Sequence, residues 1–137
     1  MKRVSLAAAI ALGLATITPA VAQPAASPVQ IMPTAPAGHT ISKYYKQPVY
    51  DPQKAKIGTI DDVVISDSGQ IEAFIIGVGG FLGMGEKNVA VAPASVHAEM
   101  KDGSWYLTLN TTKDALKAAP GLTFDKTKSN WVPSGKG

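Results

Sequence analysis

A two-residue turn between two alternating segments sets the strongest limit on how this chain folds. The turn is Asp102-Gly103, a dipeptide typical of tight β-hairpins. Apolar and polar residues alternate over residues 96–101 before it and over residues 105–110 after it. A period of two predicts strands with one dry face and one solvated face. We therefore predict an antiparallel hairpin here.

Further short segments of the same kind precede this hairpin. Residues 56–66 are β-branched and apolar, Asp67-Ser68-Gly69 is a turn, and residues 71–78 return as a second strand. Residues 48–50 and 88–92 add two short strands. Strands this short and this regularly spaced predict a small closed or nearly closed β-barrel of about six strands, because closure removes exposed sheet edges. The predicted fold class is mainly β.

The sequence period changes after residue 110. Thr111 is a hydroxyl cap with the acidic Asp114 three positions on, which is a variant of the capping box. Residues 115–119 are mainly good helix formers, and Pro120 ends the run. We predict one short C-terminal helix of about two turns, whose apolar face covers one side of the sheet.

The first residues indicate export. A basic pair at positions 2 and 3 precedes an uncharged run over residues 4–17 and then an A-x-A site, which is the pattern of a signal peptide. The run is shorter than the roughly 20 residues that span a bilayer. We expect cleavage between Ala22 and Gln23 and a mature protein in the periplasm. The expected organisation is a signal peptide over 1–22, a disordered Ala/Pro-rich spacer over 23–41, a barrel over 42–124 and a flexible tail over 125–137.

Charge and composition exclude several classes of function. Removal of Lys2 and Arg3 leaves 13 − 2 = 11 basic residues against 10 acidic ones, a net charge of +1, so nucleic acid is not an expected partner. The chain has no cysteine, which excludes disulfides, a lipidated N-terminus, c-type haem attachment and thiolate chemistry. Membrane contact is expected to be peripheral at most.

The glycine-rich segment 77–87 is the candidate binding site. Its glycine spacing matches neither the dinucleotide fingerprint nor a complete Walker loop, yet it carries Phe81, Leu82 and Met84. These apolar residues either plug one barrel end or form an exposed docking patch. The candidate partner-binding loop consists of Gly79, Gly80, Phe81, Leu82, Gly83, Met84, Gly85, Glu86 and Lys87.

Catalytic patterns do not converge anywhere in the sequence. His97 lies beside Glu99 on a solvated strand face, without the further groups that a metal or catalytic site needs. Asp61 and Asp62 are adjacent in a strand, so their side chains point to opposite faces and cannot share a proton or a metal. We expect no enzymatic activity, no catalytic residue, no metal and no cofactor.

The order of these segments resembles the PRC-barrel family. The resemblance covers about residues 42–124 and rests on residues 56–63, the turn at 67–69, the segment 79–91 and residues 110–120. The family includes the cytoplasmic barrel of the photosynthetic reaction-centre H subunit and a domain of a ribosome-maturation factor. The resemblance implies a non-enzymatic adaptor barrel without catalytic residues. Neither relative's partner transfers, because this chain lacks a full membrane helix, is expected to be exported and is hardly basic.

We therefore expect a non-catalytic periplasmic adaptor that binds an unidentified protein partner. One alternative is a barrel that binds a small molecule or lipid under the glycine-rich loop, and another is a hydrolase with an unrecognised site. The sequence does not indicate the oligomeric state.

Overall fold

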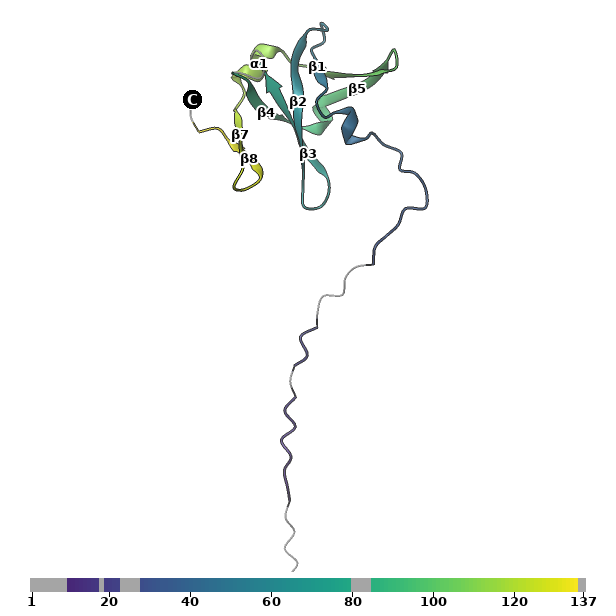
Figure 1. The fold of residues 1–137 in the computed structure, drawn as a ribbon, viewed down its shortest axis with the longest axis vertical. Helices are drawn as coiled ribbons and strands as arrows, with labels where there is room; N and C mark the ends of the chain where they lie inside the picture. The colour runs from purple at the N-terminus through teal and green to yellow at the C-terminus, as the bar shows by residue number, and fades with distance from the viewer. Residues whose placement is uncertain (1–9, 18, 23–27, 80–84, 136–137) are drawn as a thin grey trace, which may run out of the picture. The chain divides into compact units, whose positions relative to one another are not determined.

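The computed structural model describes residues 10–17, 19–22, 28–79 and 85–135. The chain divides into two units, Met1–Pro36 and Ala37–Gly137. The described residues of the first unit are exposed and form neither helix nor strand. The second unit contains every helix and strand that the structure describes (Figure 1).

The second unit is mainly β, as predicted. In chain order its described elements are η1 (Ile41–Lys43), β1 (Pro48–Tyr50), β2 (Lys56–Ile65), β3 (Ile71–Val78), β4 (Lys87–Val91), η2 (Pro93–Ser95), β5 (Val96–Lys101), β6 (Ser104–Leu109), α1 (Lys113–Ala118), β7 (Leu122–Asp125) and β8 (Asn130–Pro133). The strands form one sheet in the order β5-β6-β1-β2-β3-β4-β7-β8. Strands β1 and β6 run parallel, and the other neighbours are antiparallel.

Both predicted hairpins are confirmed. Strand β2 pairs with β3, and β5 pairs with β6 from Val96↔Leu109 to Lys101↔Ser104 without a shift in register. Asp102 and Gly103 both have positive φ, 48° and 76°, which is the backbone that a tight two-residue hairpin turn requires. The turn chemistry therefore sets the register of this hairpin.

The predicted strand number and closure are wrong. The described chain has eight strands rather than about six, and its sheet is open, with β5 and β8 at its two edges. The additional strands are β7 and β8, which follow the helix and extend the sheet beyond β4. The predicted closed barrel would have no edge strands. The sheet instead gains two strands and keeps two edges.

The structure also differs from the flexible tail expected over residues 125–137, because β8 lies within that range. Trp131 packs edge-on against Phe124 on β7, with ring centroids 5.5 Å apart. Its indole Nε1 donates a hydrogen bond to the Asp62 carboxylate at 2.8 Å. At the other end, the compact unit begins at Ala37, inside the expected spacer 23–41. His39 belongs to this unit and contacts Trp105, with ring centroids 4.6 Å apart.

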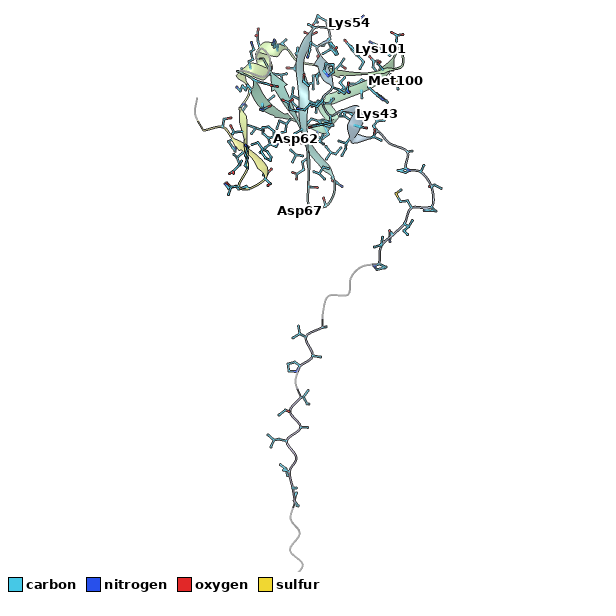
Figure 2. The ribbon with its side chains drawn as sticks, viewed as in Figure 1. Lys43, Lys54, Asp62, Asp67, Met100 and Lys101 are labelled. Carbon is cyan, nitrogen blue, oxygen red and sulfur yellow. The ribbon has the colours of Figure 1, made fainter. Side chains whose placement is uncertain are left out.

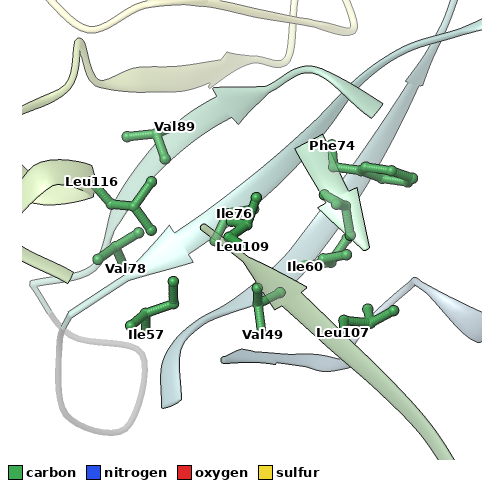
Figure 3. Close-up of a cluster of buried hydrophobic side chains, with 11 residues drawn as sticks. Val49, Ile57, Ile60, Phe74, Ile76, Val78, Val89, Leu107, Leu109 and Leu116 are labelled. Carbon is green, nitrogen blue, oxygen red and sulfur yellow. The ribbon is translucent and has the colours of Figure 1, made fainter. Parts of the chain in front are cut away.

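The hydrophobic core lies against one face of the curved sheet (Figure 3). Its buried members come from β1 to β6 and from α1, and they are Val49, Ile57, Ile60, Phe74, Ile76, Val78, Val89, Val96, Leu107, Leu109 and Leu116. Leu116 is 7% exposed, so the helix covers part of the sheet as predicted.

The helix begins one residue later than the capping pattern suggested. The cap is Thr112, whose Oγ1 accepts a hydrogen bond from the Ala115 amide at 3.1 Å. Thr112 has the extended backbone that an N-cap needs, with φ −113° and ψ 160°.

Within the described residues, the structure contains no helix of the length and apolar character that crossing a bilayer requires.

Candidate functional site

A cavity of about 770 Å³ opens on the polar face of the β5–β6 hairpin. We call it the hairpin groove. Its lining comes from the β1–β2 turn, the end of β4 with η2, the hairpin itself and the start of α1, and includes Asp51, Lys54, Val91, Ala94, Ser95, His97, Glu99, Lys101, Tyr106, Thr108, Leu109 and Leu116. Pockets that bind small molecules have volumes of roughly 300–1,000 Å³. The groove is therefore large enough to hold a ligand or a peptide segment.

The hairpin side of the groove carries two stacked tyrosine rings with the charged side chains of Lys101 and Glu99 beside them. Tyr106 stacks on Tyr50 of β1, with ring centroids 4.6 Å apart and planes inclined by 11°. The Lys101 ammonium lies 4.5 Å from the Tyr106 ring centre and 2.9 Å from Glu99 Oε1. The hydrogen bond to Glu99 raises the pKa of Lys101. This wall therefore offers an aromatic edge together with charges of both signs.

The β1–β2 turn supplies one negative and one positive side chain to the rim of the groove, Asp51 and Lys54. Asp51 Oδ1 accepts a hydrogen bond from the Ala55 amide at 2.9 Å, which holds the turn. Figure 2 shows Lys54 and Lys101 at the same end of the domain. Buried Leu109 and Leu116 give the groove an apolar lining between these polar walls.

The sequence placed two residues of this groove correctly on a solvated strand face. His97 and Glu99 are both exposed, on the same face as Tyr106. Trp105, on the opposite face of β6, is half-buried, and Lys43 and His39 lie against its ring. Within the described part of the chain, no three His, Asp or Glu side chains come close enough to hold a metal ion.

The candidate loop Gly79–Lys87 is described only at its two ends. Gly80, Phe81, Leu82, Gly83 and Met84 lie outside the described residues, so the choice between plug and docking patch stays a prediction. Gly79 and Gly85 both have positive φ, 76° and 71°. Lys87 Nζ donates a hydrogen bond to the Lys117 carbonyl oxygen at 2.5 Å. This carbonyl lies in the last turn of α1, where a cation is favourable.

Glu86 takes part in a three-residue cluster with Asp61 and Lys46. Lys46 Nζ lies 3.1 Å from Asp61 Oδ1. The Glu86 carboxyl group hydrogen-bonds Asp61, and this bond, together with burial and the negative charge of Asp61, raises the pKa of Glu86. The cluster therefore brings the residue that precedes β4 beside β2, with the carboxyl groups of Glu86 and Asp61 both next to Gly77.

Gly77 makes this carboxyl pair possible. A Cβ atom at this position would collide with the carboxyl groups of both Glu86 and Asp61. Asp61 itself lies at a register shift between Ile60 and Asp62, where β2 has one residue more than β3. No local sequence pattern indicated the pair, because its members come from different strands, although the glycine at 77 was visible.

Asp61 and Asp62 are separated as predicted. Asp61 contacts Lys46 and Glu86, whereas Asp62 accepts hydrogen bonds from the Val63 amide at 2.8 Å and from Trp131. The Asp61 carboxylate therefore interacts with Lys46 and Glu86, whereas the Asp62 carboxylate interacts with Trp131 of β8.

Comparison with known proteins identifies the family of this fold. The sequence model of the family described as PRC-barrel domain matches residues 37–116, which are 80 of the 137 residues. The chain therefore belongs to the PRC-barrel family. No curated protein matches it.

Proposed function

We propose that this PRC-barrel protein is a non-catalytic adaptor, which binds a segment of another protein in the hairpin groove. The observation that carries this proposal is the composition of the groove lining. An apolar interior formed by Val91, Leu109 and Leu116 is flanked by charged side chains and an aromatic stack. Binding sites commonly combine an apolar interior with a few polar groups that fix orientation.

The charges around the groove favour a polypeptide over a polyanion. Lys54 and Lys101 are balanced by Asp51 and Glu99, so the rim has no strong excess of either sign. Nucleic-acid sites instead concentrate positive charge. A peptide segment with one apolar anchor and charged flanks would match the rim and the lining together.

Export belongs to the same proposal. The pattern over residues 1–22 supports a signal peptide cleaved between Ala22 and Gln23, and therefore a periplasmic adaptor. The intact mass of the protein recovered from the periplasmic fraction tests this. A mass that includes residues 1–22 would contradict it.

Site-specific crosslinking in intact cells tests the groove. A photo-reactive amino acid at Ser95, which lines the groove and is exposed, should yield a discrete adduct with a partner protein. The matched control is Glu72, an exposed β3 residue outside the groove lining, which should not yield that adduct. A second variant carries the photo-reactive residue at position 95 together with Ala94→Arg. The arginine places a large side chain in the groove and should abolish the adduct. An adduct that survives Ala94→Arg would contradict the proposal.

The volume of the groove favours one alternative function, the binding of a small molecule or lipid. Native mass spectrometry of the protein purified from cells would then detect a non-covalent passenger, and Ala94→Arg would remove it. A separate Phe81→Ser, Leu82→Ser variant tests the predicted docking loop. Loss of the partner adduct in this variant, with the unfolding transition unchanged, would assign the binding to the loop.

A further inference from the structure

Strand β5 is the outermost strand on one side of the sheet (Figure 1). It pairs with β6 and with no other described strand. The other edge strand, β8, is shorter and ends at Pro133, and both features protect an edge against further pairing. Strand β5 has neither protection, since its register is continuous over six residues and it contains no proline. Glu99 and Lys101 are its only charged side chains, so the backbone groups of this edge remain a template for another strand.

The hairpin turn decides which backbone groups of β5 face outward. In an antiparallel ladder, every second residue directs its N–H and C=O away from the neighbouring strand. Lys101 and Ser104 flank the two-residue turn and bond to each other, so the outward residues are Val96, Ala98 and Met100. The amide of Val96 already donates to the Pro93 carbonyl. Both groups of Ala98, both groups of Met100 and the carbonyl of Val96 remain for a partner strand.

These groups and the side-chain charges together select one register for pairing between two copies of β5. A two-fold axis beside Ala98 or beside Glu99 gives an equally long overlap within Val96–Lys101. An axis at Glu99 would place two carboxylates opposite each other, so Ala98 is the favoured centre. Ala98 then faces Ala98 of the second copy, and Met100 faces Val96. The available groups form about four backbone hydrogen bonds in this arrangement.

The side chains of β5 are complementary in the same register. His97 lies opposite Glu99 of the second copy, and an imidazole N–H donates well to a carboxylate. This pair is of the closer kind, in which cross-strand side chains interact most strongly. On the opposite face, Met100, which is 55% exposed, lies against Val96 of the second copy. The register therefore places an apolar residue opposite the exposed Met100 side chain and a hydrogen-bond acceptor opposite the imidazole.

We propose that two copies of this protein associate through their β5 edges, antiparallel and centred on Ala98, to form one continuous sheet. The two hairpin grooves then lie on the same assembly, one on each copy. The occupant of the edge is thus a second copy of this chain.

Single cysteines test the register, because the chain contains none of its own. In the proposed dimer the two Cα atoms at position 98 are about 5.5 Å apart. This is within the range of a disulfide, so Ala98→Cys should form a covalent dimer on mild oxidation. The matched control is Met100→Cys, whose two copies are displaced by roughly 14 Å along the strands and should stay unlinked. Equal linkage of both variants, or linkage of neither, would overturn the proposal.

Charge exchange gives a second test that needs no disulfide. His97→Glu places two carboxylates opposite each other, and Glu99→Lys places an ammonium group opposite the imidazole in place of its acceptor. Each variant alone should sediment as a monomer under conditions in which the wild-type protein is a dimer. An equimolar mixture should recover the dimer, because the carboxylate introduced in one variant then faces the ammonium group introduced in the other. The two native side chains, Glu99 of the first variant and His97 of the second, also face each other. Failure of the mixture to recover the dimer would overturn this register.

Proline at position 98 separates self-association from other uses of the edge. Ala98→Pro removes an outward N–H and leaves the β6 ladder intact, so it should lower the dimer fraction without lowering the unfolding midpoint appreciably. A wild-type protein that sediments as a monomer at its highest soluble concentration would overturn the proposal. If Ala98→Pro also abolished the Ser95 adduct of that monomer, the edge would take a strand from a different protein.

Discussion

The indole N–H of Trp131 donates to the Asp62 carboxylate at 2.8 Å, across 69 residues of sequence. This bond joins β8 to β2, although neither strand pairs with the other in the sheet. The acceptor is charged and the bond is partly buried, so it anchors the last strand of the described chain.

We expect Trp131→Phe to destabilise the protein by about 1.5 kcal/mol, because it keeps an aromatic ring beside Phe124 but removes a hydrogen bond to a charged group. Urea unfolding monitored by circular dichroism measures the change. Asp62→Asn retains an acceptor and should cost less. An unchanged midpoint for Trp131→Phe would show that the bond contributes nothing to stability.

Glu86→Gln should change how stability depends on pH. The pKa of Glu86 is raised, so the folded protein binds this proton more tightly than the unfolded chain. The resulting stabilisation is complete below the ordinary value of 4.5 and is lost as the pH rises through the folded pKa. Glutamine keeps a neutral donor to Asp61 at every pH. The free energy of unfolding of Glu86→Gln relative to wild type should therefore increase as the pH rises above that ordinary value.

The matched control for this pH dependence is Glu72→Gln, since Glu72 is exposed. Lys46 and Lys56 oppose the upward shift of the Glu86 pKa, so the effect should grow when Lys46 is replaced by Met. A wild-type minus Glu86→Gln difference that is flat between about pH 4 and 7 would contradict the raised pKa of Glu86.

Gly77→Ala should destabilise the protein by about 1–3 kcal/mol, because the added methyl group must displace both the Glu86 and the Asp61 carboxyl groups. Thermal unfolding provides the measurement. Gly135→Ala is the control, since a Cβ atom there meets open space. Equal stability of the two variants would mean that the carboxyl pair can move away freely.

Thr112→Ala should cost about 1 kcal/mol of stability, because it removes the acceptor for the Ala115 amide at the first turn of α1. Thr112→Ser keeps the hydroxyl and should retain most of the stability. The two variants are compared by their urea midpoints. If alanine and serine gave the same loss, packing of the threonine methyl group would explain it in place of the cap.

The glycine-rich loop stays a predicted binding site, and none of its described residues lines the hairpin groove. Its glycines, apolar residues and charges were visible in the sequence, and its described ends carry specific contacts, such as Lys87 with α1. The hairpin groove was not visible. It combines Asp51, Ala94, Tyr106 and Leu116, which come from four separate segments. The parallel pairing of β1 with β6, which no local pattern encodes, brings the β1–β2 turn with Asp51 close to Tyr106.

Local residue patterns were enough to define the hairpins, the helix and the mainly β class. These patterns are an Asp-Gly turn, a period of two and a run of helix formers. Each involves residues that are neighbours in the sequence, so the sequence is enough to predict its effect. The open sheet, its exposed β5 edge, the attachment of β8 and the Asp61–Glu86 pair became visible only in three dimensions. Each of these features depends on which distant strands come together. The packing of the whole core decides that pairing, and no single segment contains enough of the core to decide it alone.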